Sequence, residues 1–353
     1  MRTIATQRHS STARRVSLLI SKAAGWLLVA IFAVLLALRG AAAWREEGSP
    51  PPPPDTQIIT TPTGSVAVHV SGPADGPRLL IVHGTAAWGG FWRDSAALLA
   101  SQGWRVIAVD LPPFGWSGHD AQARYDRASQ ADRLAAVIHA TGTDPAMIVA
   151  HSFGAGAATE LALRHPARVR GLVLVDAALG QLDPTAETAA ASAMRFRPFA
   201  ELVTAALLTN PVALPPLLRS LLANKDSADQ WISTLRAPMS RQGTTSAYAA
   251  WLPNLFAASD GALSRSSAAL RQIKVPVAII WGGADTVTPL VQGKRLASLT
   301  RAKSLAVLPG VGHIPHIEDP KGFTAALDRA LDALQAKQST PQRAAPAPAP
   351  ASG

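Results

Sequence analysis

Cysteine is absent from this chain of 353 residues. Disulfide bonds, cysteine-ligated zinc sites and thiol catalysis are therefore excluded. The absence does not identify the compartment, because disulfide-free proteins occur on both sides of a membrane. Charge is also scarce: 16% of the residues are charged and 48% are hydrophobic, so we expect a largely globular protein with a buried core.

The chain also lacks a basic stripe interleaved with aromatic residues, which is the usual mark of a nucleic-acid-binding surface. The net charge is +10, but much of it lies at the two ends. Residues 1–47 hold seven basic and two acidic residues, and the tail after residue 336 holds two basic ones. The body between them holds 24 basic and 21 acidic residues, so we expect no nucleic-acid partner.

A long hydrophobic run, residues 16–38, overlaps the end of the basic N-terminal segment 1–22. Lys22 is the only charged residue within the run. About 20 helical residues span the apolar core of a bilayer. The run therefore predicts a transmembrane signal anchor with the lipid bilayer as partner. The excess of basic residues before it predicts a cytoplasmic N-terminus, a single pass through the cytoplasmic (inner) membrane, and a globular body of the chain on the periplasmic side.

A cleaved signal peptide is the alternative interpretation of this run, because "AAA" at 41–43 is a plausible cleavage site. The protein would then be secreted after cleavage near Ala43. The length of the run and the charge of Arg39 favour the anchor. Segment 39–55 contains "SPPPPP" and is expected to be a stiff, extended linker, and the Pro/Ala-rich tail 337–353 is expected to be disordered.

The body alternates short apolar runs with stretches of helical character, which predicts a mostly parallel central sheet flanked by helices. This α/β core is divided into a first part, 56–177, and a second part, 273–336. Strands are expected at 57–70 (a pair), 78–84, 104–110, 146–151, 169–176, 275–282 and 302–310, and helices near 91–101, 125–141, 153–164 and 320–336.

Residues 178–272 interrupt this alternation with several helical stretches broken by prolines, such as "NPVALPPLLRSLL". They predict a helical lid inserted between two strands. Its apolar residues are expected to pack on the core and partly to face a substrate pocket.

The stretch "IVAHSFGAGAA" (148–158) predicts a strand-to-helix turn that presents Ser152. Ala150 stands where the usual Gly-x-Ser-x-Gly pattern has its first glycine, whereas Gly154 is retained. A serine hydroxyl needs a base within hydrogen-bond reach and an acid that orients the base. Asp285 in "WGGADTVTP" and His313 in "PGVGHIPHIEDP" follow in that chain order, each just after an expected strand.

From about residue 56 to 335, the chain resembles the α/β-hydrolase superfamily. "VHGTAAWGGFW" is similar to its His-Gly oxyanion loop, "DLPPFGWSG" (110–118) to its Asp-x-x-x-x-Gly-x-Ser loop, and "GHIPHIEDP" to its histidine segment. Each motif is weak alone, and their order makes the signal strong. The resemblance implies the following roles: Ser152 as nucleophile, His313 as base, Asp285 as acid, and the backbone N–H groups of Phe153 and Thr85 (or Ala86) as oxyanion donors.

Several of these assignments have competitors. Asp176, which also follows a strand, is the rival acid, and His316 is the rival base. His83 is expected to shape its loop and Asp110 to tie loops together. The candidates for pocket lining are Trp88, Trp116 and His151.

The predicted activity is hydrolysis of a small, apolar ester or related acyl substrate through an acyl-serine intermediate. No metal or cofactor is implied. A serine nucleophile disfavours the epoxide-hydrolase and haloalkane-dehalogenase branches, which use a carboxylate. A C–C bond hydrolase or a perhydrolase/haloperoxidase-like enzyme with the same triad stays open, as does a non-catalytic ligand-binding protein of the same fold.

Overall fold

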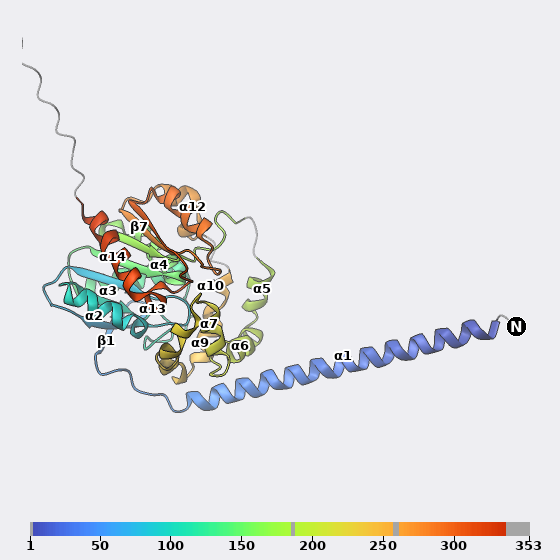
Figure 1. The fold of residues 1–353 in the computed structure, drawn as a ribbon. Coiled ribbons are helices and arrows are strands. Elements are labelled where there is room, and N and C mark those ends of the chain that lie inside the picture. Colours follow the sequence, from blue (N-terminus) through green and yellow to red (C-terminus); the bar gives the residue numbers. More distant parts are fainter. Residues whose placement is uncertain (1–2, 185–187, 257–260, 337–353) are drawn as a thin grey trace, which may run out of the picture.

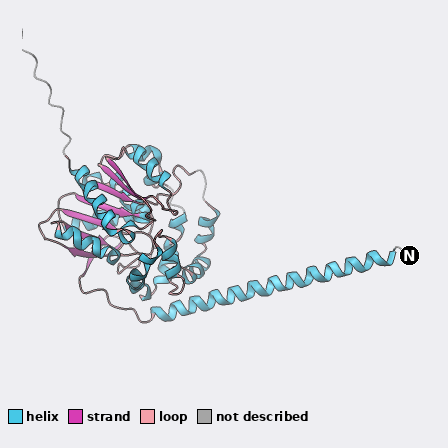
Figure 2. Ribbon diagram, in the orientation of Figure 1, coloured by secondary structure: helices cyan, strands magenta, loops and turns pink. Residues whose placement is uncertain are grey.

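A computed structural model describes residues 3–184, 188–256 and 261–336, so the predicted tail 337–353 lies outside the described residues. One sheet of eight strands has the order β1-β2-β4-β3-β5-β6-β7-β8 (Figures 1 and 2). Neighbours from β4 to β8 are parallel, whereas β1 and β2 add an antiparallel edge. The strands are β1 (Thr56–Thr61), β2 (Gly64–Ser71), β3 (Arg78–Val82), β4 (Arg105–Val109), β5 (Ala146–His151), β6 (Val169–Val175), β7 (Val277–Gly282) and β8 (Ser304–Leu308).

Helices cover both faces of this sheet, as the apolar strands predict. In β5, Met147 and Val149 pack into one core, and Ile148 and Ala150 pack into the other. The helices η1 (Gly89–Trp92), α2 (Arg93–Ser101), α13 (Pro315–Glu318) and α14 (Pro320–Gln335) contribute to the first core. The helices α3 (Arg127–Thr141), α4 (Ser152–Arg164) and α12 (Leu290–Thr300) contribute to the second, and η2 (Pro166–Arg168) follows α4. The expected α/β fold is confirmed.

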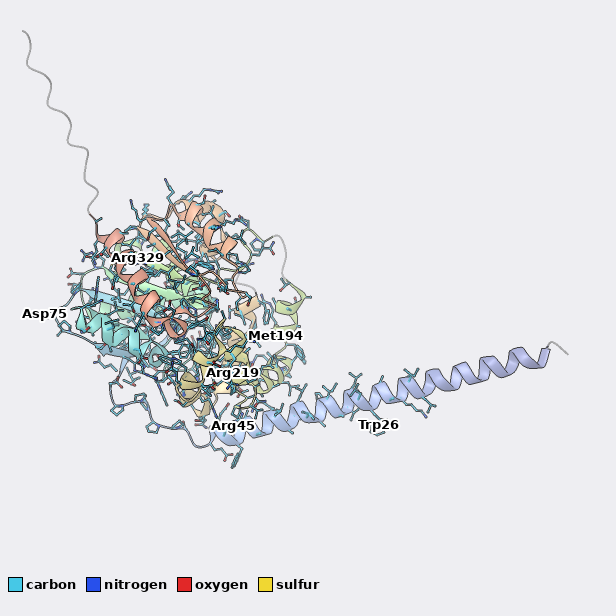
Figure 3. All side chains as sticks on the ribbon, in the orientation of Figure 1. Trp26, Arg45, Asp75, Met194, Arg219 and Arg329 are labelled. Atoms are coloured by element: carbon cyan, nitrogen blue, oxygen red, sulfur yellow. The ribbon has the colours of Figure 1, made fainter. Side chains whose placement is uncertain are left out.

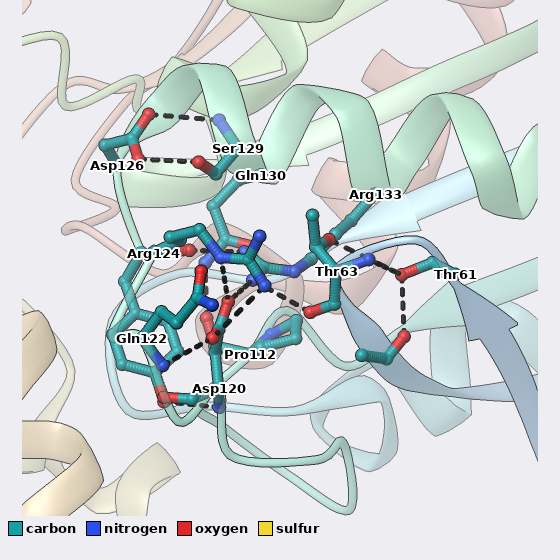
Figure 4. A network of polar contacts seen from close by, with 12 residues as sticks. Thr61, Thr63, Pro112, Asp120, Gln122, Arg124, Asp126, Ser129, Gln130 and Arg133 are labelled. Carbon is teal, nitrogen blue, oxygen red and sulfur yellow. Dashed lines mark hydrogen bonds and ion pairs between the residues drawn. The ribbon is translucent and has the colours of Figure 1, made fainter.

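A buried ion pair holds the loop between β4 and α3 in place (Figure 4). Arg133 is only 1% exposed, and its guanidinium lies 2.6 Å from the carboxylate of Asp120. The same guanidinium donates to the carbonyl oxygens of Arg124 and Thr63. Because a buried charge is costly without such partners, these bonds fix the loop that leads from the end of β4 to α3.

The chain between β6 and β7 forms a helical insert. Its apolar side chains, among them Leu214, Trp231 and Trp251, join the first core. The insert contains α5 (Ala189–Arg195), α6 (Arg197–Ala206), α7 (Leu214–Ser220), η3 (Lys225–Trp231), α8 (Ile232–Arg236), η4 (Ala237–Ser240), α9 (Thr244–Trp251), α10 (Pro253–Phe256), η5 (Leu263–Arg265) and α11 (Ser267–Arg271).

One long helix, α1 (Thr3–Glu46), projects away from the rest of the molecule (Figure 1). Its segment Leu19–Glu46 contains a window of mean hydropathy 2.2 that is not buried in the protein, so it is long and apolar enough for a membrane span or a signal sequence. The structure differs from the predicted linker 39–55, since residues 39–46 are helical. They include good helix formers such as the alanines at 41–43, and proline first appears at Pro50.

The last turns of α1 are bound to the insert. Glu46 is 7% exposed, and its carboxylate accepts hydrogen bonds from the backbone N–H groups of Gly243 (3.1 Å) and Thr245 (2.8 Å) at the start of α9. The first N–H groups of a helix have no partner within the helix and favour a negative charge. Glu46 therefore caps α9 and ties α1 to the insert.

We expect Glu46→Ala to lower the free energy of unfolding of the full chain in detergent by about 2 kcal/mol, because the variant leaves two backbone donors without their charged acceptor. Chemical denaturation followed by tryptophan fluorescence measures this loss. Glu47→Ala, the same change at an exposed neighbouring site, is the control and should have little effect. Equal stability of the two variants would refute the capping role.

Candidate active site

Ser152 lies in the turn between β5 and α4 with a φ of 50°, a left-handed conformation that a serine rarely adopts. A Cβ atom at Gly154 would lie 2.2 Å from the carbonyl oxygen of His83, so this position requires glycine. Ala150 instead lies in β5, where its methyl group is fully buried in the second core. The turn thus needs the glycine that the sequence retains and accommodates the alanine that departs from the usual pattern.

A chain of hydrogen bonds connects Ser152, His313 and Asp285. The serine Oγ lies 2.8 Å from His313 Nε2, and His313 Nδ1 lies 2.8 Å from Asp285 Oδ2. All three residues are buried, with exposed fractions of 6% or less. Because the carboxylate accepts the Nδ1–H proton, Nε2 is free to accept the proton of the serine hydroxyl. This arrangement can convert the hydroxyl into a nucleophile.

Asp285 is ionised despite its burial. Burial alone would raise the pKa of its carboxyl, but hydrogen bonds from His313 and Thr288, together with the charge of His313, lower that pKa to about 2. The Thr288 hydroxyl donates to Oδ2 at 2.6 Å, and the backbone N–H groups of Val287 and Thr288 donate to Oδ1. These bonds fix the carboxylate that orients His313.

Asp176, the rival acid, takes a different position. It follows β6, is fully buried, and its Oδ1 accepts the backbone N–H of Gly282 at 2.8 Å. Burial and the adjacent Asp285 carboxylate raise the pKa of Asp176 well above its usual value, which favours its protonated form. The structure therefore brings Asp285, rather than Asp176, to His313 as the charged partner, and Asp176 accepts a backbone hydrogen bond instead.

These two carboxyl groups and His313 Nδ1 lie within 4.8 Å of one another, a spacing that metal ligands can have. However, Nδ1 is hydrogen-bonded to Asp285, and the raised pKa of Asp176 favours its protonated form. A metal ligand must be deprotonated, so this set fits proton transfer better than cation binding.

His83 is a fixed, neutral part of the loop that follows β3. Its Nε2 accepts the backbone N–H of Leu111 (2.9 Å), so its Nδ1 donates to the carbonyl oxygen of Gly84 (2.7 Å). Burial lowers the pKa of His83, which agrees with this single tautomer. His83 thus holds the start of the loop 84–87 beside Ser152, in keeping with its expected structural role.

Two other histidines lie near the site without taking the place of His313. His151 Nε2 donates to the carbonyl oxygen of His313 (2.7 Å), and burial lowers the pKa of His151 to about 3, so it stays neutral. His316, the rival base, stacks on Trp92 with ring centroids 3.8 Å apart. Neither ring nitrogen of His316 has a hydrogen-bond partner in the described structure, whereas His313 contacts Ser152 directly.

The loop 84–87 and the start of α4 lie beside Ser152 and contain the backbone N–H groups expected to act as donors. Thr85 and Ala86 line the cavity that contains Ser152, and a Cβ atom at Gly84 would lie 3.0 Å from the Cβ atom of Ser152. Phe153 belongs to the first turn of α4, where backbone N–H groups lack partners within the helix. These donors can bind a negatively charged oxygen formed next to Ser152.

The cavity over Ser152 has a volume of about 260 Å³ and a largely apolar wall. The side chains from the insert that line it are Leu208, Leu214, Leu217, Leu218, Leu221, Leu235 and Leu255. Sequence reasoning expected the lid to line a pocket but did not name these leucines. The run "NPVALPPLLRSLL" was the available signal, because it supplies four of them.

Trp88 and Trp116 are not among the residues that line this cavity, which corrects the prediction for both; His151 is among them. The two tryptophans pack edge to face, and Trp88 Nε1 donates to the carbonyl oxygen of Thr234 in the insert. They border two larger hollows, of about 490 and 650 Å³, whose linings do not include Ser152. Their rings therefore support the insert.

The family model for the alpha/beta hydrolase fold matches residues 77–320, more than half of the chain. The chain belongs to the α/β-hydrolase family. This hydrolase is 31% identical over 263 residues to a 2-hydroxymuconate semialdehyde hydrolase of Pseudomonas sp. (strain CF600), covering 73% of this chain and 87% of the relative. It is 30% identical over 250 residues to a pimeloyl-[acyl-carrier protein] methyl ester esterase of Neisseria meningitidis serogroup B (strain H44/76). This match covers 70% of this chain and 90% of the esterase.

Among solved structures, this hydrolase shares its fold with a membrane phospholipase A described as a bacterial virulence factor. The TM-score is 0.63 at 24% sequence identity, and the match covers 93% of this chain and 99% of the phospholipase. The resemblance inferred from the sequence motifs is thus confirmed at the level of the family.

Asp176→Asn tests the protonation of Asp176. Because its pKa is raised in the folded protein, the protonated carboxyl of Asp176 contributes to the free energy of unfolding. This contribution is fully present below the pKa of the unfolded state and is lost as the pH rises through the folded-state pKa. Asparagine keeps an acceptor and a donor without this dependence, and it tolerates the positive φ of 42° at this site. We therefore expect the free energy of unfolding of the variant to rise relative to that of the wild type as the pH increases. The difference is about 1.4 kcal/mol for each unit between the folded-state and unfolded-state pKa values of Asp176.

Denaturant unfolding at pH 4, 6 and 8 measures this difference, with the exposed Asp75→Asn as the control. A wild type that remains as stable as Asp176→Asn at pH 8 would show that Asp176 is ionised in the folded protein.

Proposed function

We propose that this α/β hydrolase cleaves an ester or related acyl substrate through an acyl-serine intermediate on Ser152. The observation that carries the proposal is the pair of 2.8 Å contacts from Ser152 through His313 to Asp285, placed at the floor of an apolar cavity. The relatives named above are hydrolases, in agreement with this chemistry.

The reaction follows from the geometry. His313 Nε2 takes the proton of the Ser152 hydroxyl as Oγ attacks the carbonyl carbon, and Asp285 stabilises the resulting imidazolium. The backbone N–H groups of Phe153 and Thr85 bind the oxyanion of the tetrahedral intermediate. The proton then passes from His313 to the departing alcohol, which leaves an acyl group on Ser152. Water, activated by the same histidine, hydrolyses this acyl-enzyme.

The wall of the cavity favours an apolar acyl group. Its polar side chains are Thr85, His151, Ser152 and His313, and the described lining contains no lysine or arginine. C–C bond cleavage is the second candidate, because one relative is a semialdehyde hydrolase. A muconate skeleton carries carboxylate, for which this lining has no cationic partner, so ester cleavage is favoured.

We also infer that α1 anchors the hydrolase in a membrane. No residue of its most hydrophobic window is buried in the protein, and burial of that surface in lipid is strongly favourable. The fold shared with a membrane phospholipase A supports the same inference.

Ser152→Ala should abolish labelling by a fluorophosphonate probe and lower kcat for a nitrophenyl ester by at least about 10⁴-fold, because the variant has no nucleophile. Mass spectrometry of the labelled peptide and a chromogenic assay measure the two effects. Ser101→Ala, at an exposed serine, is the matched control and should behave as wild type.

A panel of nitrophenyl esters and a semialdehyde C–C substrate, given to the same two variants, separates the two candidate reactions. Folded wild type that neither reacts with the probe nor turns over any ester would refute the proposal.

A further inference from the structure

Two contacts fix the direction of α6 relative to α1. Arg39 Nε lies 3.1 Å from Glu201 Oε2 in the middle of α6, and Arg45 donates to the carbonyl oxygen of Thr209 (3.0 Å), just beyond the end of α6. The helices α1 and α6 therefore run in the same direction. The start of α6, with α5 before it, must lie on the side toward which the apolar part of α1 projects (Figure 1).

This side of the insert carries exposed aromatic residues. Phe196, between α5 and α6, is 66% exposed, and Phe199 is 39% exposed. Phe196 precedes Glu201 by five residues, so at about 1.5 Å per residue it lies roughly 7 Å beyond Arg39 along α1. Phe196 therefore lies beside the hydrophobic run of α1 that ends before Arg39. Arg195 and Arg197 flank Phe196 in the sequence, a composition that suits the boundary between acyl chains and phosphate headgroups.

The open rim of the Ser152 cavity lies next to the same elements. Three of the apolar residues that line the cavity are also exposed, Leu217 (37%), Leu255 (41%) and Val287 (45%). Leu255 belongs to α10, which packs against α5, and its neighbour Phe256 is 41% exposed. An apolar path therefore connects the exposed surface near α5 with the cavity.

We propose that Phe196, Phe199, Leu255 and Phe256 form a docking surface that enters the bilayer leaflet next to α1 and admits the acyl chain of a membrane lipid ester to the cavity. Clustered exposed apolar side chains mark such contact surfaces. Because Glu46, Arg39 and Arg45 fix α1 to the insert, the anchor sets the orientation of this surface toward the leaflet. The substrate part of this inference rests on the proposed ester hydrolysis, whereas the docking rests on the inferred anchoring of α1 alone.

The absence of cysteine allows a direct test, because a single introduced cysteine is the only site that a thiol-reactive dye can label. The full chain bearing Phe196→Cys and an environment-sensitive dye is incorporated into phosphatidylcholine–phosphatidylglycerol vesicles. Quenchers attached to the lipid acyl chains should reduce its emission several-fold. Asp75→Cys is the control, since Asp75 is exposed on the side away from α1, whereas Met194, close to Phe196, lies on the side toward α1 (Figure 3). Absence of quenching at position 196 would overturn the docking.

The second arm tests the substrate part with the double variant Phe196→Ser, Phe199→Ser. Hydrolysis of a long-chain phospholipid in the same vesicles should fall at least about tenfold, while turnover of a soluble nitrophenyl ester stays within twofold of wild type. Unchanged phospholipid hydrolysis, or an equal loss of both activities, would overturn delivery from the leaflet. Wild type that hydrolyses neither ester would refute the proposed function, and the quenching result would still decide the docking.

Discussion

The buried carboxylate of Asp285 is the charge on which the geometry of the site depends. It remains ionised only because His313, Thr288 and the backbone donors near it supply hydrogen bonds in place of water. In return, it holds the His313 ring in the orientation and tautomer that bring Nε2 to Ser152. Loss of that carboxylate would leave the imidazole without its orienting partner.

Burial favours the neutral form of the groups around this pair. It lowers the pKa of His83 and of His151, and together with the Asp285 carboxylate it raises the pKa of Asp176. Each of these side chains makes a hydrogen bond of its own: His83 within the loop 84–87, His151 to the backbone of His313, and Asp176 with the backbone N–H of Gly282. The negative charge is therefore confined to the group that stabilises an imidazolium, which is the arrangement that acyl transfer requires.

The insert connects this chemistry to the N-terminal helix. Its leucines form the wall of the cavity, and its helices α6 and α9 receive the end of α1 through Arg39 and Glu46. Most of these leucines belong to α7, α8 and α10, whereas α1 contacts α6 and α9, so different helices of one insert line the cavity and receive α1. The larger hollows beside Trp88 and Trp116 lie away from Ser152, which separates the packing of the insert from the substrate cavity.

The sequence by itself predicted the sheet, the covering helices and the three residues Ser152, His313 and Asp285 that hydrogen bonds join, because continuous apolar strands and reactive side chains at strand ends are local patterns. It favoured Asp285 as the acid but kept Asp176 as a rival. That choice depends on hydrogen bonds between loops far apart in the chain, and only the tertiary structure decided it. The tertiary structure likewise showed that both tryptophans lie outside the cavity, because the direction of a side chain follows from packing. It also showed that α1 continues to Glu46, where its end contacts the insert.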